Sequence, residues 1–118
     1  MDDVNLVELK AKWDRLKLKL ADQFEEEPDL QTVVFLVGVQ ELGHGFKKFT
    51  KDQKMDIMHI ATCRLLSTYG YYELESIDQE GWPHWVQKEK IPYLTVQQQD
   101  RLLKQAVVDY FIENGLLD

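Results

Sequence analysis

The sequence is short of the residues that mark several large classes of protein. It has one cysteine, Cys63, so it cannot form an internal disulfide, which agrees with a reducing compartment. Only 14 basic residues stand against 21 acidic ones, and the resulting net charge of -7 disfavours binding to nucleic-acid phosphates. The longest apolar run, residues 33–39, falls far short of the roughly 20 residues of a membrane span. The first ten residues also lack the basic and apolar regions of a secretory signal, so we expect a cytoplasmic protein that binds neither nucleic acid nor membrane.

What the sequence does contain is typical of one small globular domain. It has 118 residues, of which 44% are hydrophobic and 30% are charged, close to the averages for folded proteins. A chain of this length can bury most of a single core. We therefore expect one domain over residues 1–118, with no linker or internal repeat.

Four segments show the spacing of amphipathic or buried helices. The predicted helices cover residues of about 4–26, 29–43, 51–69 and 95–114. Thr50 with Gln53, and Thr95 with Gln98, have the spacing of capping boxes and mark the starts of the third and fourth helices. Between them, aromatic and β-branched residues around the turn sequence "DQEG" predict a hairpin over about 71–90. The fold class is thus mostly α, a compact four-helix domain with a short β-hairpin between the third and fourth helices.

The first helix carries two apolar stripes. One is made of Leu6, Leu9, Trp13, Leu16 and Leu20. A second stripe beside it, of Val7, Ala11, Leu18 and Ala21, widens the face. This width favours packing within a bundle, and it leaves open a homodimer through the first helix.

A group of potential metal ligands spans the second and third helices. Glu41-x-x-His44 is followed by Asp56-x-x-His59, and Cys63 lies one further turn along the face that Asp56 and His59 share. If the two helices pair antiparallel, Glu41 comes near Asp56 and His59. Carboxylate, imidazole and thiolate groups together suit a single zinc or iron ion.

The same residues also have a purely structural interpretation. Glu41 ends the apolar stripe of the second helix, so its carboxylate needs a partner, and His59 could supply one. Cys63 would then pack as a small hydrophobic side chain. Because this interpretation needs no ligand, we expect no metal, with one zinc or iron ion as the alternative.

A second candidate site is the sequence "GWPHWVQ" at residues 81–87. Trp82, His84 and Trp85 offer the aromatic and polar groups that dominate binding hot spots, although tryptophans of a small domain also complete its core. No serine stands in a nucleophile-elbow motif, and Cys63 is predicted within a helix, away from a positive helix end. These features favour a noncatalytic protein-interaction module over an enzyme.

The run "FLVGVQELGHGFKKFTKDQKMDIMHIATCRLL", with "YGYYE" and "GWPHW" after it, resembles a family of short bacterial proteins with no assigned function. The resemblance covers roughly residues 28–114. It implies a free-standing cytoplasmic bacterial protein and adds no activity, cofactor or catalytic residue. The function we expect is binding of another protein or of a second copy, and the alternative is a small metal-binding protein or metal-dependent enzyme that uses Glu41, His44, Asp56 and His59.

Overall fold

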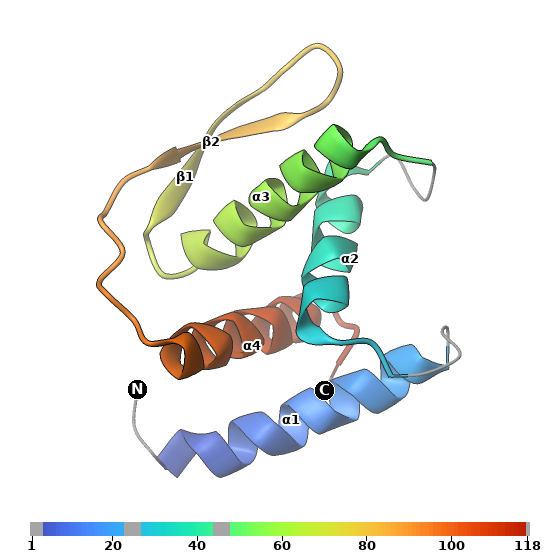
Figure 1. The fold of residues 1–118 in the computed structure, drawn as a ribbon, viewed down its shortest axis with the longest axis vertical. Coiled ribbons are helices and arrows are strands. Elements are labelled where there is room, and N and C mark those ends of the chain that lie inside the picture. Colours follow the sequence, from blue (N-terminus) through green and yellow to red (C-terminus); the bar gives the residue numbers. More distant parts are fainter. Residues whose placement is uncertain (1–3, 23–26, 44–47, 118) are drawn as a thin grey trace. The chain divides into compact units, whose positions relative to one another are not determined.

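The computed structural model of the protein describes residues 4–22, 27–43 and 48–117. Its elements are α1 (Val4–Ala21), α2 (Leu30–Leu42), α3 (Lys51–Ser67), β1 (Tyr72–Ile77), β2 (Pro83–Gln87) and α4 (Val96–Glu113) (Figure 1). The predicted fold class is confirmed, since an antiparallel hairpin lies between the third and fourth helices. Within the described ranges, no helix combines the length and the apolar character that crossing a membrane requires.

The chain divides into two units. One comprises Met1–Leu30 together with Leu94–Asp118, and the other is the continuous segment Gln31–Tyr93. The first unit contains α1 and α4, and the second contains nearly all of α2, together with α3 and the hairpin. The predicted single domain over residues 1–118 stays a prediction.

The first unit is built on the packing of α1 against α4. The stripe predicted on the first helix is buried at Leu9, Trp13, Leu16 and Leu20. Lys17 and Lys104 place their ammonium groups 6.0 and 5.6 Å from the centre of the Trp13 ring, within the range of cation–π attraction.

The second stripe of α1 is on the surface. Val7 is 80% exposed and Leu18 is 62% exposed, so these side chains do not contribute to a core. The homodimer through the first helix stays a prediction.

Most helix boundaries lie close to those predicted. Thr50 and Thr95 accept hydrogen bonds from the backbone of Gln53 and Gln98, and the glutamine side chains bond back, so both capping boxes are confirmed. The exception is α1, which ends at Ala21 instead of near residue 26; residues 23–26 lie outside the described part of the chain. Its last buried apolar side chain is Leu20, and an acidic residue follows at Asp22, where the negative end of a helix dipole disfavours a carboxylate.

In the second unit, α2 and α3 meet at a glycine. A Cβ atom at Gly38 would lie 2.5 Å from both the carbonyl oxygen and Cγ2 of Ile57. A second contact joins Glu41 to Arg64, so these two contacts advance toward the carboxyl end on both helices. An antiparallel hairpin would make them run in opposite directions, and the two helices instead cross in Figure 1.

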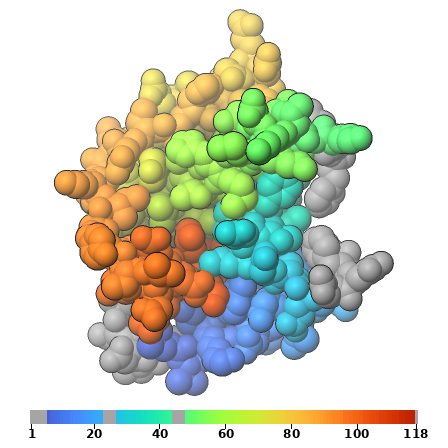
Figure 2. Space-filling view, viewed as in Figure 1, coloured from blue at the N-terminus to red at the C-terminus, as the bar shows by residue number. Residues whose placement is uncertain are grey.

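The hairpin lies along α3, which contacts both strands. Figure 2 shows its yellow and orange atoms against the green atoms of α3. Tyr72 pairs with Gln87 at one end and Ile77 with Pro83 at the other, with a register shift between Leu74 and Ser76. Gly81, with φ of 88°, closes the predicted "DQEG" turn in a conformation that favours glycine.

Candidate functional site

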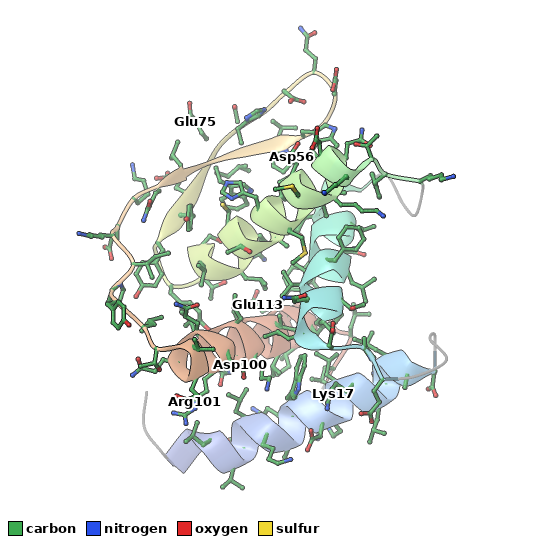
Figure 3. The ribbon with its side chains drawn as sticks, viewed as in Figure 1. Lys17, Asp56, Glu75, Asp100, Arg101 and Glu113 are labelled. Carbon is green, nitrogen blue, oxygen red and sulfur yellow. The ribbon has the colours of Figure 1, made fainter. Side chains whose placement is uncertain are left out.

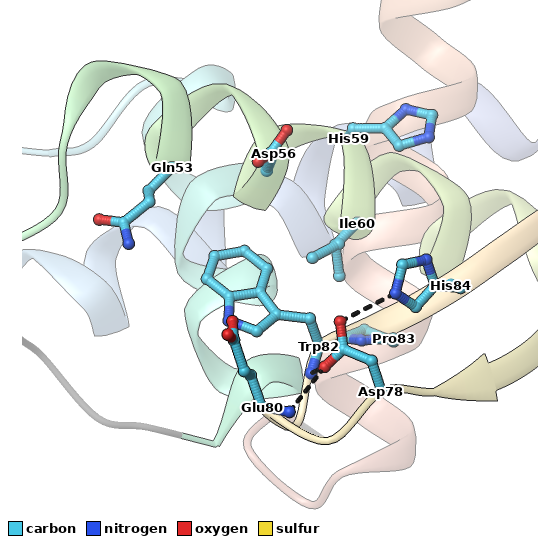
Figure 4. Close-up of a pocket in the computed structure, with 9 residues that line it drawn as sticks. All are labelled: Gln53, Asp56, His59, Ile60, Asp78, Glu80, Trp82, Pro83 and His84. Carbon is cyan, nitrogen blue, oxygen red and sulfur yellow. Dashed lines mark hydrogen bonds and ion pairs between the residues drawn. The ribbon is translucent and has the colours of Figure 1, made fainter.

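A cleft opens between α3 and the turn end of the hairpin (Figure 4). Its volume is about 420 Å³, enough for one large side chain and the backbone beside it. Five of its nine lining residues belong to the hairpin and four to α3. From α3 these are Gln53, Asp56, His59 and Ile60, and from the hairpin Asp78, Glu80, Trp82, Pro83 and His84.

The α3 side of the cleft follows from helical spacing. Gln53, Asp56 and His59 are three residues apart, so their side chains lie on one face of the helix. The side chain of Gln53 also completes the capping box with Thr50, which fixes the first turn. Ile60 is 5% exposed and gives this wall an apolar base.

Asp78 organises the opposite wall. One of its carboxylate oxygens accepts hydrogen bonds from the backbone N–H groups of Glu80 and Trp82, both at 2.9 Å. Its other oxygen lies 2.9 Å from Nε2 of His84. These contacts hold the pKa of Asp78 below its ordinary value of 3.8, and the hydrogen bond with His84 makes the largest contribution. The ionised carboxylate therefore fixes the backbone that presents Glu80 and Trp82.

Trp82 has two roles in this wall. It packs against a buried cluster of Val39, Leu42, Phe49 and Ile57, to which Phe35 also contributes; we call this the Phe49 cluster. The same side chain is only half-buried and lines the cleft. The core therefore holds the indole ring in place where it lines the cleft.

The cleft is rich in acidic groups. Three of its lining residues are carboxylates, two are histidines, and none of the nine is lysine or arginine. In Figure 4 the indole ring of Trp82 is drawn between the side chains of Asp56 and Glu80. Within residues 4–22, 27–43 and 48–117, neither of these two carboxylates forms a hydrogen bond or ion pair, whereas Asp78 is fully engaged.

The predicted metal ligands do not come together in the part of the chain that the structure describes. Glu41 lies 3.2 Å from Nε of Arg64, which supplies the partner that its half-buried carboxylate needs. Nε2 of His59 lies 3.5 Å from Sγ of Cys63. Among described residues, no group of three or more histidine, cysteine, aspartate or glutamate side chains could hold a metal ion. His44 lies outside these ranges, so the complete ligand set stays a prediction.

Cys63 has the environment of a core residue. Its side chain is fully buried, and burial raises the pKa of its thiol to about 11. The thiol therefore stays protonated near neutral pH, where only the thiolate is an effective nucleophile or metal ligand. This placement agrees with the structural interpretation of Cys63 as a small hydrophobic side chain.

The predicted aromatic site is divided by the structure. Trp82 and His84 line the cleft. Trp85 does not; it pairs with Leu74 across the strands, and its Nε1 atom is buried without a hydrogen-bond partner among the described residues. Asp56 and His59, which the sequence suggests as metal ligands, line the cleft instead.

Sequence reasoning missed Asp78 and Glu80 as site residues. Their signal was the turn sequence "DQEG", which predicts a reversal of the chain but does not say which helix the turn lies against. Gln53 was noted only as part of a capping box.

Comparisons with known proteins add no relative. The chain matches no protein-family model, no curated protein and no solved structure. The resemblance to short bacterial proteins is not tested by these comparisons.

Proposed function

We propose that this protein is a noncatalytic interaction module that binds another protein through the cleft between α3 and the hairpin. The observation that carries the proposal is Trp82, which the Phe49 cluster fixes from one side while its ring lines an open cleft. Interface hot spots are enriched in tryptophan held in this manner, because a rigid aromatic ring loses little entropy on binding. We also propose that it acts in the cytoplasm, as the lone cysteine indicates.

The composition of the cleft supports binding over catalysis. Asp78 and His84 form a carboxylate–imidazole pair, which in many enzymes activates a nucleophile. None of the nine lining residues is serine, threonine, cysteine, lysine or tyrosine, so the described cleft gives this pair no hydroxyl, thiol or amine nucleophile to activate. The buried Cys63 thiol is protonated near neutral pH.

Affinity capture with matched variants tests the proposal. The intact protein, Trp82→Ala, Glu80→Ala and Tyr93→Ala would each be used to recover proteins from extract of the producing cells. Tyr93 is a suitable control because it is 93% exposed and does not line the cleft. We expect a partner that Tyr93→Ala retains and that both cleft variants lose, and we would confirm it with the purified pair.

The Glu80→Ala variant controls for loss of binding that is caused by misfolding of Trp82→Ala. Trp82→Ala also removes a side chain from the Phe49 cluster, whereas the Glu80 side chain is exposed at the turn. Circular dichroism and a thermal melt of each variant would show which ones fold. Recovery of the same proteins by all four, or loss only in a variant that is unfolded, would refute binding through the cleft.

A further inference from the structure

The cleft combines a ligand-sized cavity, an aromatic wall and two carboxylates, of Asp56 and Glu80, that have no partner among the residues the structure describes. The first two features describe a general binding site, and the third restricts what the site can accept. An ionised carboxylate that loses water on binding needs a hydrogen-bond donor or a positive charge in exchange. An anionic ligand would bring like charges together, since the lining residues include three carboxylates and neither lysine nor arginine.

We infer that the ligand group is the guanidinium of an arginine side chain in the partner protein, seated on the indole ring of Trp82 and bonded to Asp56 and Glu80. This inference rests on the proposed function and names the chemistry of the partner.

Three properties favour guanidinium over the ammonium group of lysine. Guanidinium is planar and can stack on an indole ring, where cation–π attraction adds to contact. Its five N–H donors point in several directions within one plane, so it can bond to two carboxylates at once. It is also less strongly hydrated than ammonium and loses less when water leaves the cleft.

Asp78 is not one of the proposed ligand contacts. Its two oxygens already accept from Glu80, Trp82 and His84, and breaking these bonds would release the turn. Asp56 comes from α3 and Glu80 from the hairpin turn, so an arginine between them would also join the two walls.

A peptide titration followed by NMR tests the inference directly. The probe is acetyl-Gly-Arg-Gly-amide, added to the ¹⁵N-labelled protein at pH 7.5 and low salt. In two control peptides, lysine or citrulline replaces the arginine. Lysine keeps the positive charge as an ammonium group, and citrulline keeps the shape of arginine without its charge. We expect saturable shifts of the Trp82 indole and Glu80 amide signals, with citrulline binding at least about tenfold more weakly. Equal binding of citrulline or of lysine would overturn the assignment.

Protein variants locate the site. Asp56→Asn and Glu80→Gln should each weaken arginine binding by about three- to tenfold. Glu75→Gln is the control, because it removes one negative charge from the same hairpin at a residue that does not line the cleft (Figure 3). An equal loss in Glu75→Gln would mean that only net charge matters and would overturn the site.

Failure of the arginine peptide to bind, while Trp82→Ala still abolishes capture of a partner, would refute the ligand class and leave the proposed function standing.

Discussion

At the residue scale, one carboxylate holds the hairpin turn together. Asp78 accepts two backbone hydrogen bonds within its own turn and contacts His84 on β2. The backbone N–H of Asp78 also donates to the carbonyl of Trp82 at 3.0 Å. A single substitution can therefore release the wall that carries Glu80 and Trp82.

Acid should release this turn in the intact protein. Because the folded-state pKa of Asp78 is lowered, its ionised form stabilises the turn above the ordinary pKa of 3.8. This contribution is lost as the pH falls through the lower, folded-state pKa. We expect the amide signals of Glu80 and Trp82 to shift in this acid range, as followed by NMR between pH 6 and 2.

Asp78→Asn is the matched variant. It keeps the size of the side chain but cannot ionise, so its turn amides should exchange faster at pH 6 and show no acid transition of their own. An acid transition of the same size in Asp78→Asn would assign the change to another carboxylate.

Two residues show what the sequence could and could not predict at this scale. The need of Glu41 for a partner followed from its place at the end of an apolar stripe, and a partner is present. Its identity as Arg64 did not follow, because it depends on the angle at which α2 crosses α3. That angle is set by contacts between helices, which periodicity within each helix does not contain.

At the element scale, Gly38 decides how closely α2 and α3 approach. Glycine normally weakens a helix by roughly 0.5–1 kcal/mol relative to alanine, so propensity alone favours Gly38→Ala. A Cβ atom there would nevertheless lie 2.5 Å from the backbone carbonyl oxygen of Ile57, which cannot move as a flexible side chain can. The steric clash with Ile57 should therefore outweigh the gain in helix propensity.

We expect Gly38→Ala to lower the free energy of unfolding by about 2–3 kcal/mol, as overpacking of a core does. Urea unfolding would measure the change, with Gln40→Ala as an exposed control on the same helix. Adding Ile57→Ala should give no rescue, because it removes Cγ2 but leaves the carbonyl oxygen. A Gly38→Ala variant as stable as the parent would show that the helices can move apart at little cost.

Prediction of the elements succeeded where the signal is local. The two capping boxes and the turn sequence fixed the starts of α3 and α4 and the reversal of the hairpin. The cleft could not be predicted in the same manner. Its walls come from Gln53–Ile60 and Asp78–His84, and only the packing of the hairpin on α3 brings them together.

At the scale of the whole molecule, electrostatics is dominated by excess negative charge. The net charge is -7, and several ion pairs join residues of one helix at its surface, such as the exposed Lys10–Asp14 pair at 3.0 Å. Exposed pairs of this kind contribute little and are screened by salt. Repulsion among the surplus carboxylates is screened by the same salt.

We expect repulsion among the surplus carboxylates to outweigh the attraction within the exposed ion pairs. Raising sodium chloride from 20 to 300 mM at pH 7 should increase the melting temperature by about 3–6 °C, because screening relieves self-repulsion of the folded state. Differential scanning calorimetry would measure the melting temperature at each salt concentration. Glycerol at equal osmolality would control for stabilisation by exclusion of solute from the protein surface. A melting temperature that falls with salt would show that the ion pairs matter more than the net charge.

The unit that contains α1 and α4 has a consequence for how the protein is made. α1 leaves the ribosome before its packing partner α4, which is encoded at residues 96–113. The segment 31–93 lies between them and is continuous, so its local contacts can form as it emerges. Throughout that interval Trp13 and the leucines beside it have no α4 to cover them. The nascent chain therefore displays an apolar helix face until residues 96–113 have emerged, which is the kind of surface that chaperones bind.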